Sequence, residues 1–313
     1  MRAVIASLML SAMLFTMAPT ARAAEIGAVL PGRALAFWRA LTSGMTAAAK
    51  DLQVDLVVRS PVDSAALDEQ KNIQLQMIDF MVRRRVAALV LCPEPLDGVA
   101  GPVPIAVPTV FVDRLSTDYT ALAAVTSDNF AIGRKAALLL APMLRKGARV
   151  VMLRVAANVP STSAREEGFL SVAREKGWVI VADPYVGHKL REAEVLTAKV
   201  LEDRQGHLDA VFAPNESVAY GAVRAVAAMP AEGRPRLVAV DWRPEFRAAL
   251  ENGILTAAVL QNPYRMGYRA VVAAVAVSQG HSPAAHEIIE ATVLTRETMN
   301  DPAVLAVAAA YTD

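Results

Sequence analysis

Cysteine and histidine are scarce in this sequence, and their scarcity excludes whole classes of site. Cys92 is the single cysteine among 313 residues. It cannot form an internal disulfide, and it cannot belong to a metal site built from several thiolates. We expect Cys92 to be a small buried hydrophobic side chain. Four histidines are present, and none stands in a recognisable catalytic setting.

The sequence motifs of several enzyme classes are absent too. There is no G-x-S-x-G nucleophile elbow, no H-E-x-x-H metal helix, no Walker A loop and no G-x-G-x-x-G turn. We therefore expect a chain that is not an enzyme and that binds neither a cofactor nor a metal ion. Catalysis stays the alternative, because fold alone does not fix function. Turnover of a bound compound would support that alternative.

Neither sign of charge is in excess. Lys and Arg number 32 and Asp and Glu number 31, which gives a net charge of +1. Nucleic-acid binding normally shows as a basic excess or stripe, so we expect no nucleic-acid partner. No low-complexity tract and no block of like charges interrupts the chain, and 54% of its residues are hydrophobic. We expect the chain to fold throughout, and its length suits two lobes of ordinary size.

Long apolar runs are missing except near the N-terminus. After Arg2, residues 4–17 are apolar apart from scattered Ser and Thr, and an A-x-A sequence ends at Ala23. A positive start, an apolar middle and small residues at the end are typical of a secretory signal peptide, here residues 1–23. The alternative is a membrane-spanning helix, but the run falls short of the ~20 apolar residues that a span needs. We expect an exported protein with a soluble mature chain.

Beyond residue 23 the chain alternates β-branched runs with amphipathic stretches. Such alternation is typical of parallel sheets covered by helices, and about ten strands favour two sheets over one. The predicted strands are 26–30, 55–58, 88–91, 109–112, 150–153, 179–182, 210–213, 237–240 and 257–260. The predicted helices are 37–50, one around 73–81, 130–144 with Asp128 as its cap, 165–176, 191–203, 216–228, 245–252 and 264–279. Residues 304–310 form either a final helix or an added strand.

Polar residues follow the predicted strands at the point where each strand ends. Asp113-Arg114, Asn215, Asp241 and Gln261 each stand within two residues of such an end. Ligands of open parallel sheets bind just beyond the carboxyl ends of the strands. We therefore expect these side chains, although remote in sequence, to line one shared gap between the two lobes.

This set of side chains suits a polyhydroxy ligand. Carboxylates accept hydrogen bonds from hydroxyls, guanidinium groups donate a rigid fork of them, and amides do both. The aromatic pair Phe37-Trp38, which follows the first predicted strand, could cover the apolar face of a sugar ring. Structural alternatives stay open: Asp241 could cap the next helix, Asp113 and Arg114 could form an ion pair, and Phe37 could belong to the core.

Several spaced motifs together resemble one family. The chain is similar to the periplasmic sugar-binding proteins of the ribose-binding type, which share the type I periplasmic binding fold with the ligand domain of the lactose repressor. The resemblance covers nearly the whole chain after residue 23. Its motifs are, in chain order, Phe37-Trp38, Val112-Asp113-Arg114, Thr126-Ser127-Asp128-Asn129 with Gly133, Ser163-Ala164-Arg165-Glu166-Glu167-Gly168-Phe169, Val211-Phe212-Ala213-Pro214-Asn215-Glu216 with Gly221-Ala222, Val240-Asp241, and Gln261-Asn262-Pro263 with Gly267.

The resemblance implies two Rossmann-like lobes, each a parallel sheet flanked by helices, joined by a multi-strand hinge with the ligand cleft between them. Residues 24–127 with 262–290 would form the N-terminal lobe, 128–261 the C-terminal lobe, and 291–313 a tail that could cross between them. The implied ligand contacts are Phe37 and Trp38 as a stacking pair, Asp113 and Arg114 from the first lobe, Arg165, Asn215 and Asp241 from the second, and Gln261 at the hinge.

The resemblance also implies a function and partners. A periplasmic protein of this kind would capture a sugar or related polyol, or a sugar acid, by hinge closure and deliver it to the permease of an ABC-type importer. The alternative is a sensor that presents its closed form to a membrane histidine kinase or chemoreceptor. No DNA-binding helix-turn-helix stands before residue 26, which argues against a repressor. We expect a monomer.

The sequence departs from the ribose binders at several positions. Leu35 and Cys92 stand where ribose binders place asparagine, and His188 falls near a position that is often aromatic. These differences argue against ribose itself as the ligand. Arg33 and Arg39 beside the cleft leave room for an acidic sugar, unless both are solvated surface arginines.

Overall fold

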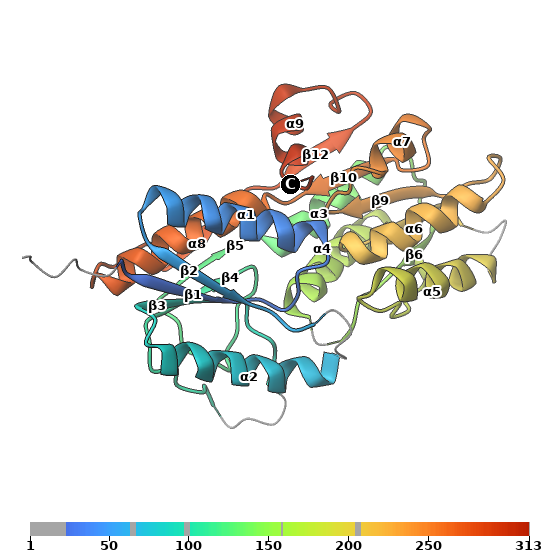
Figure 1. The fold of residues 1–313 in the computed structure, drawn as a ribbon. Coiled ribbons are helices and arrows are strands. Elements are labelled where there is room, and N and C mark those ends of the chain that lie inside the picture. The colour runs from blue at the N-terminus through green and yellow to red at the C-terminus, as the bar shows by residue number, and fades with distance from the viewer. Residues whose placement is uncertain (1–22, 63–66, 97–100, 158, 204–207, 313) are drawn as a thin grey trace, which may run out of the picture.

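The computed structural model describes residues 23–62, 67–96, 101–157, 159–203 and 208–312. Nearly all of the segment in which we expect a signal peptide lies outside these ranges. Within them, no helix is both long and apolar enough to cross a membrane. The described chain forms two lobes that lie side by side, each built around its own sheet (Figure 1). This agrees with the two sheets that the sequence predicts.

The first lobe contains a sheet in which every pairing is parallel. Its strands are, in order across the sheet, β11 (His286–Ile288), β5 (Ala123–Thr126), β4 (Thr109–Val112), β3 (Ala88–Leu91), β1 (Glu25–Val29) and β2 (Asp55–Arg59). The chain order reverses between β1 and β3, and it is at such a reversal that open α/β sheets bind ligands, beyond the carboxyl ends of the strands.

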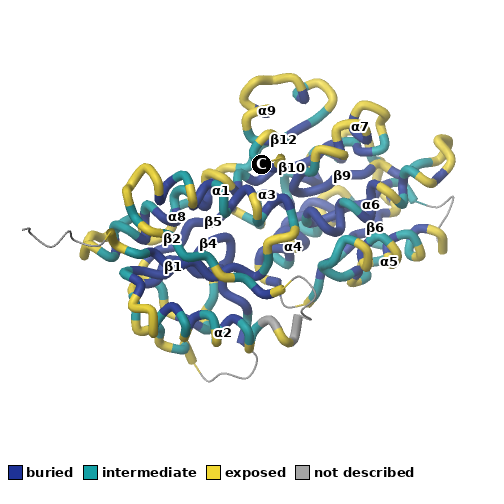
Figure 2. The backbone as a smooth tube through the Cα atoms, in the orientation of Figure 1, coloured by how far each residue is buried: buried dark blue, intermediate teal, exposed yellow. Residues whose placement is uncertain are grey.

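The second lobe repeats this arrangement with one difference. Its strands are, in order across the sheet, β12 (Thr292–Thr295), β10 (Ala257–Leu260), β9 (Arg236–Val240), β8 (Ala210–Ala213), β6 (Arg149–Met152) and β7 (Val179–Ala182). The edge strand β12 runs antiparallel to β10, whereas the other pairings are parallel. Helices cover both faces of each sheet, and the central strands are accordingly buried (Figure 2).

The helices pack on the sheets in pairs. They are α1 (Ala36–Asp51), α2 (Leu67–Arg84), α3 (Asn129–Leu140), α4 (Pro160–Lys176), α5 (Leu190–Glu202), α6 (Glu216–Ala228), α7 (Phe246–Glu251), α8 (Pro263–Ser278) and α9 (Pro302–Ala309). In the first lobe α1 packs beside α8 on one face and α2 covers the other. In the second, α3 packs beside α4, and α5 beside α6 covers the opposite face.

Glycines allow two of these helix pairs to approach closely. A methyl group at Gly44 of α1 would overlap the carbonyl oxygen of Tyr264 in α8. A methyl group at Gly133 of α3 would likewise overlap the carbonyl oxygen of Arg165 in α4. Backbones that lie this close leave room for no side chain, so both positions require glycine.

The chain passes between the two sheets three times. It crosses between β5 and α3, between β10 and α8, and between β11 and β12. Asp128 begins α3 at the first crossing, and its side chain accepts a hydrogen bond from the Ala131 amide at 2.9 Å, which confirms the predicted cap. Beyond β12, α9 packs on that strand, and Tyr311 is fully buried after it.

Some elements differ from those that the sequence predicts. β5, β11 and β12 were not predicted, because β5 is rich in alanine and the other two are short edge strands with polar residues. Helix α4 begins at Pro160, five residues before the predicted start. The tail forms a helix, which decides the alternative left open for 304–310.

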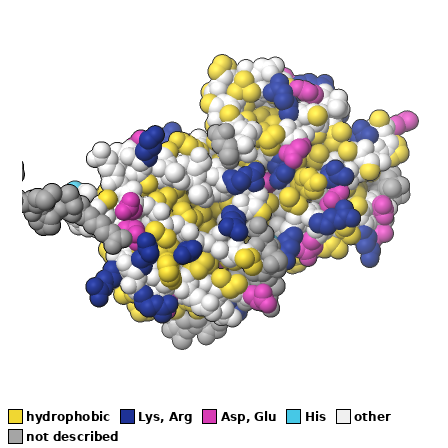
Figure 3. Space-filling view, viewed as in Figure 1, with side chains coloured by type: hydrophobic (Ala, Val, Ile, Leu, Met, Phe, Trp, Pro, Cys, Tyr) yellow, Lys and Arg dark blue, Asp and Glu magenta, His cyan; other side chains and the backbone are white. Residues whose placement is uncertain are grey.

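On the face drawn in Figure 3, basic and acidic side chains are interspersed.

Candidate functional site

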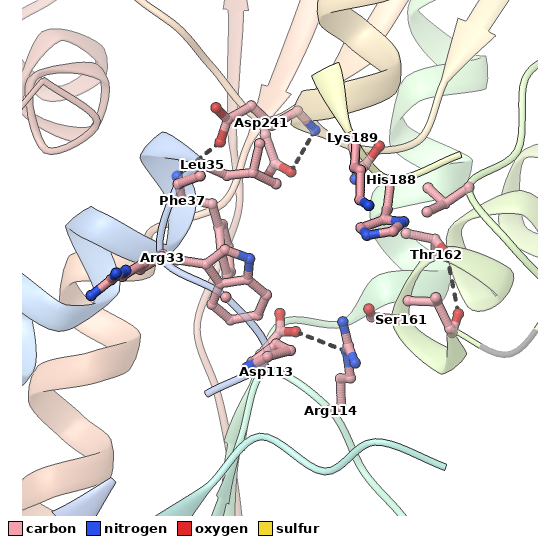
Figure 4. A pocket seen from close by; sticks show the side chains of 18 of the residues that line it. Arg33, Leu35, Phe37, Asp113, Arg114, Ser161, Thr162, His188, Lys189 and Asp241 are labelled. Atoms are coloured by element: carbon pink, nitrogen blue, oxygen red, sulfur yellow. Dashed lines mark hydrogen bonds and ion pairs between the residues drawn. The ribbon is translucent and has the colours of Figure 1, made fainter. Parts of the chain in front are cut away.

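A cavity of about 310 Å³ lies between the two lobes, at the carboxyl ends of strands from both sheets (Figure 4). The residues that the sequence predicted as ligand contacts all line it, namely Phe37, Trp38, Asp113, Arg114, Arg165, Asn215, Asp241 and Gln261. They come from the start of α1 and α4 and from the ends of β4, β8, β9 and β10. The structure thus brings these remote stretches together. Their contact with a ligand stays a prediction.

Two aspartates occupy equivalent places in the two lobes. Asp113 follows β4 and Asp241 follows β9, and each has a positive φ, of 65° and 71°. The amide of Asp113 donates to Val125 O and that of Asp241 to Val259 O, both at 3.0 Å. Aspartate is among the few residues that adopt this left-handed conformation readily. The turn ends each strand and directs a buried carboxyl toward the cavity, and burial raises the pKa of both.

Asp241 is the centre of a buried hydrogen-bond network. It accepts from the side-chain amide of Gln261 at 2.7 Å and from the backbone amide of Glu216 at 3.1 Å. The Tyr311 hydroxyl lies 3.5 Å away, and the Arg165 guanidinium lies at 3.8 Å. The alternative that Asp241 caps the next helix is wrong, because α7 begins five residues later and its N-cap position makes no side-chain bond.

Arg165 is held from two directions. Its Nε donates to Asn129 Oδ1 and its Nη1 donates to the carbonyl of Pro214, each at 2.9 Å. The first partner begins α3 and the second follows β8, so the guanidinium connects three elements of one lobe. With 3% of its surface exposed, Arg165 is a rigid, buried cation beside the carboxylate of Asp241.

Arg114 provides the corresponding cation of the first lobe. Its Nη1 lies 2.7 Å from Glu94 Oε1, and its Nε lies 3.5 Å from Asp113 Oδ2. The predicted Asp113–Arg114 pair is therefore present, but Glu94 is the closer partner. Burial alone would lower the pKa of Arg114, but Glu94, Cys92 and Asp113 together raise it above its ordinary value, so the side chain stays charged. Its guanidinium carbon lies 6.0 Å from the centre of the Trp38 ring.

The aromatic pair serves both the core and the cavity. Phe37 and Trp38 meet edge to face with ring centres 4.8 Å apart. Phe37 is 5% exposed and belongs to the hydrophobic core of the first lobe, as the structural alternative proposed, yet it also lines the cavity. Asn215 likewise has both a structural and a cavity position. Its side chain caps α6 by accepting from the Val218 amide, and the residue also lines the cavity.

Glu216 is a cavity residue that the sequence reasoning missed. Its two carboxylate oxygens accept from the backbone amides of Ala36 and Phe37, both at 2.9 Å, and Arg243 lies 2.8 Å away. The carboxylate comes from the second lobe and the amides from the first, so these bonds cross the cleft. Leu35, at the N-cap of α1, offers no side-chain acceptor for the first amides of the helix. The absence of a capping residue was the one sign in the sequence that another segment must supply the acceptor.

Four further cavity residues were not among the predicted ligand contacts. Ser161 and Thr162 stand in the first turn of α4, and His188 and Lys189 precede α5. Arg33 lines the cavity and Arg39 does not, and both side chains are exposed, so a role of either in binding an acidic sugar stays a prediction. The serine and threonine were missed because the predicted helix began after them.

Cys92 is fully buried, as predicted for a small hydrophobic residue. Its sulfur lies 3.7 Å from Asp113 Oδ2, and burial raises the pKa of the thiol. Such a thiol is inert at neutral pH. Within the described ranges, no cluster of three or more His, Cys, Asp or Glu is placed to hold a metal ion.

Comparison with known proteins agrees with this geometry. The model of the periplasmic binding protein domain family matches residues 26–282. The chain is 26% identical over 268 residues to the ribose import binding protein RbsB of Escherichia coli (strain K12), which covers 83% of this chain and 87% of that protein.

Solved structures are similar over almost the whole length. A periplasmic component of an ABC-type sugar transport system from Hahella chejuensis is 28% identical, with a TM-score of 0.78 over 87% of this chain and 100% of that one. A carbohydrate transporter solute-binding protein from Agrobacterium radiobacter, in complex with D-arabinose, has a TM-score of 0.80 over 91% and 99%, at 24% identity. Since the family model spans both lobes and the cavity between them, this chain belongs to the periplasmic binding protein domain family.

Proposed function

We propose that this protein binds a monosaccharide or a related polyhydroxy compound in the interlobe cavity, without transforming it, and delivers it to an ABC-type importer. The observation that carries the proposal is the convergence of buried charged and amide side chains from both lobes on one cavity of about 310 Å³. That volume lies at the lower end of the ~300–1,000 Å³ that small-molecule sites occupy. The relatives named for sugar import support the same ligand class.

Each predicted contact has a chemical role in this proposal. Asp113 and Asp241 accept hydrogen bonds from ligand hydroxyls, and Arg114 and Arg165 donate them. Asn215 and Gln261 can do either, while Phe37 and Trp38 cover an apolar face of the ring. A compound that lacks a hydroxyl would leave these buried groups unpaired, so the site should discriminate strongly among sugars.

We further propose that the lobes close on the ligand by a hinge. The moving bodies are residues 24–127 with 262–290, and residues 128–261, with 291–313 as a tail that crosses between them. The three passages of chain between the sheets support this division. Such connecting segments can bend as a hinge while they keep the two lobes joined. The proposal includes export to the periplasm after loss of residues 1–23, and a monomeric state.

Thermal shift with a panel of pentoses, hexoses, polyols and sugar acids tests the proposal. A ligand that binds the native state alone stabilises it by about 2.7 kcal/mol at a concentration of 100 Kd, so at least one compound should raise the Tm clearly. Arg165→Ala should abolish that shift, whereas Arg174→Ala, which removes an exposed arginine of the same helix, should preserve it. A panel without any shift, or an unchanged affinity of Arg165→Ala, would contradict the proposed function.

A further inference from the structure

The N-terminus of α4 opens on the cavity without a cap. Its N-cap residue, Val159, has no side-chain acceptor, and Pro160 has no amide hydrogen. The next two residues, Ser161 and Thr162, line the cavity. Their backbone amides have no hydrogen-bond partner among the residues that the structure describes. By contrast, the N-termini of α3 and α6 are capped by side chains. Two free donors and the positive end of a helix therefore face the ligand space.

The hydroxyl of Ser161 is a second, independent indication of a ligand at this place. Ser161 is 6% exposed, lines the cavity and has no hydrogen-bond partner in the described part of the chain. Figure 4 shows it beside Arg114, at the edge of the open space. The hydroxyl is open to the cavity and free to bond to a ligand, whereas its neighbour Thr162 already bonds to the carbonyl of Val159. A ligand acceptor would satisfy the Ser161 hydroxyl.

Basic side chains surround the same wall. His188, Lys189 and Arg114 line the cavity near Ser161 (Figure 4). The Nε2 atom of His188 is buried and has no partner among the described residues. Burial, and then the charge of Lys189, lowers the pKa of His188, and Arg114 adds to this effect. All three side chains line the same cavity, and all of them can donate hydrogen bonds.

The carboxylates of the cavity have donors of their own, and Asp113 lies 3.5 Å from Arg114. Asp241 is bonded to Gln261 and Glu216 accepts from two backbone amides. Glu94, the partner of Arg114, does not line the cavity. The start of α4 thus brings hydrogen-bond donors and no carboxylate to the cavity, whereas the cavity carboxylates Asp113, Glu216 and Asp241 come from other segments. The hydroxyls of a neutral sugar can accept from these donors, but the oxygens of an anion form stronger, charge-assisted hydrogen bonds with them and are favoured by the positive end of the helix.

We propose that the ligand is an anionic monosaccharide, such as an aldonate or a uronate, whose acidic group binds at the N-terminus of α4. Its oxygens accept from the amides of Ser161 and Thr162 and from the Ser161 hydroxyl, and Arg114 and Lys189 supply positive charge. This inference rests on the proposed sugar-binding function and specifies the ligand class of the same cavity. A carboxylate and a phosphate share the required chemistry, so the test includes both.

Calorimetric titration of the whole protein with neutral sugars and with the acids derived from them tests the inference. The probes are D-galactose and D-glucose, their uronates and aldonates, and their 6-phosphates. We expect at least one anionic sugar to bind about tenfold or more tightly than its neutral parent, because charge-assisted hydrogen bonds at a helix N-terminus replace neutral ones. Binding of the carboxylates or of the phosphates identifies which acid the site takes.

Two variants and a control assign the effect to Ser161 at the start of α4 and to Lys189 before α5. Ser161→Ala and Lys189→Gln should each weaken the anionic sugar by about three- to tenfold and change the neutral sugar by less than twofold. Lys199→Gln, which removes an exposed lysine from α5, should change neither. If neutral sugars bind as tightly as the acids, or if Ser161→Ala weakens both equally, the inference is overturned and the proposed function stands. If no sugar of either kind binds, the proposed function itself fails.

Discussion

At the scale of single residues, the two left-handed aspartates connect backbone geometry with ligand binding. Asp113 and Asp241 turn the chain at the ends of equivalent strands, and the same turn brings their carboxyls to the cavity. Asparagine tolerates this conformation as well as aspartate does, whereas alanine pays roughly 1–2 kcal/mol for it. Substitution at these positions can therefore separate the structural role from the chemical one.

Asp241→Asn should lower the affinity for the sugar that the protein binds without unfolding it. The amide keeps the φ of 71° but removes the negative charge opposite Arg165, and hydrogen bonds to charged groups contribute about 1.5–3 kcal/mol each. We expect an affinity loss of about tenfold or more by calorimetry, with a small change in Tm. Asp241→Ala should lower the Tm as well. Equal Tm values for the two variants would refute the conformational argument. The control is Asp79→Asn on the exposed face of α2, which should change neither the affinity nor the Tm.

His188 should make the binding of an acidic sugar depend on pH. Burial and Lys189 keep its pKa below the ordinary value of about 6.5, with Arg114 acting in the same direction and Glu192 and Glu94 opposing it. A bound carboxylate favours the protonated ring, so binding takes up a proton and affinity should rise about three- to tenfold from pH 8 to pH 6. Titration in buffers of different ionisation enthalpy measures that uptake. His188→Gln should abolish it and His281→Gln should not; persistence in His188→Gln would exclude this residue.

Sequence reasoning found the site residues whose position follows from the sheet. Asp113 and Asp241 stand directly after strands, and parallel strands end at one edge, so their meeting in the cavity was predictable. Ser161 was not, because serine and threonine at the start of a helix look like loop residues in the sequence. Glu216 was missed for another reason: its partners are backbone amides from the other lobe, and no local pattern reveals a contact across 179 positions.

At the scale of elements, close helix contacts depend on glycine. Gly44→Ala should destabilise the protein, since the new methyl meets the Tyr264 carbonyl and would push α1 away from α8. Overpacking of this kind costs about 1–3 kcal/mol, although alanine is the better helix former. Urea unfolding measures the loss. Thr46→Ala, two residues along on the exposed side of α1, should be neutral or stabilising. A neutral Gly44→Ala would show that the two helices separate at little cost.

The N-terminus of α1 depends on the other lobe. Glu216→Gln replaces one of the two acceptors of the Ala36 and Phe37 amides with a donor, and removes the negative charge from the helix end. We expect the free energy of unfolding to fall by about 1–3 kcal/mol, as when a buried hydrogen bond is left unmade. X-ray scattering without ligand should show a larger radius of gyration, because these bonds hold the lobes together. Glu202→Gln, at the exposed end of α5, is the matched control; equal scattering curves for both variants would contradict the argument.

The same scale shows which elements a sequence reveals. Strands such as β8 and β10 are buried on both faces and were predicted with their bounds, because burial demands continuous apolar runs. β11, by contrast, is only three residues long and two of them are a histidine and a glutamate, so its sequence does not indicate a strand. It forms because it pairs with β5, and the local sequence does not encode that contact. The edges of both sheets therefore depend on tertiary context.

At the scale of the whole molecule, the two lobes share one hydrophobic cluster. It runs from α1 and α8 in the first lobe to α5 and α6 in the second. The tail contributes to this region, because Tyr311 donates at 3.2 Å to the carbonyl of Gln261, a residue that lines the cavity. Buried polar groups thus sit where the lobes meet, and their ionisation affects the stability of the entire protein.

The ligand-free protein should be more stable at mildly acidic than at neutral pH. Burial raises the pKa of Asp113, Glu166, Glu216 and Asp241, so these groups bind protons more tightly in the native state than in the unfolded chain. The stability linked to such groups is present below the unfolded pKa of about 4 and is lost as the pH rises through the higher native values. His188, with its lowered pKa, acts in the opposite direction as a single group. The carboxyls with lowered pKa, such as Glu175, are exposed and contribute little.

We therefore expect the Tm to be higher at pH 5.5 than at pH 7.5. Differential scanning calorimetry across this range measures the slope. Asp113→Asn and Asp241→Asn remove two of the responsible groups and should together reduce it, whereas Asp79→Asn, on an exposed carboxylate paired with Arg83, should leave it unchanged. A Tm that rises steadily from pH 5.5 to 7.5 would mean that the cavity carboxyls are ionised in the empty protein and are stabilised by Arg114 and Arg165 more than burial disfavours them.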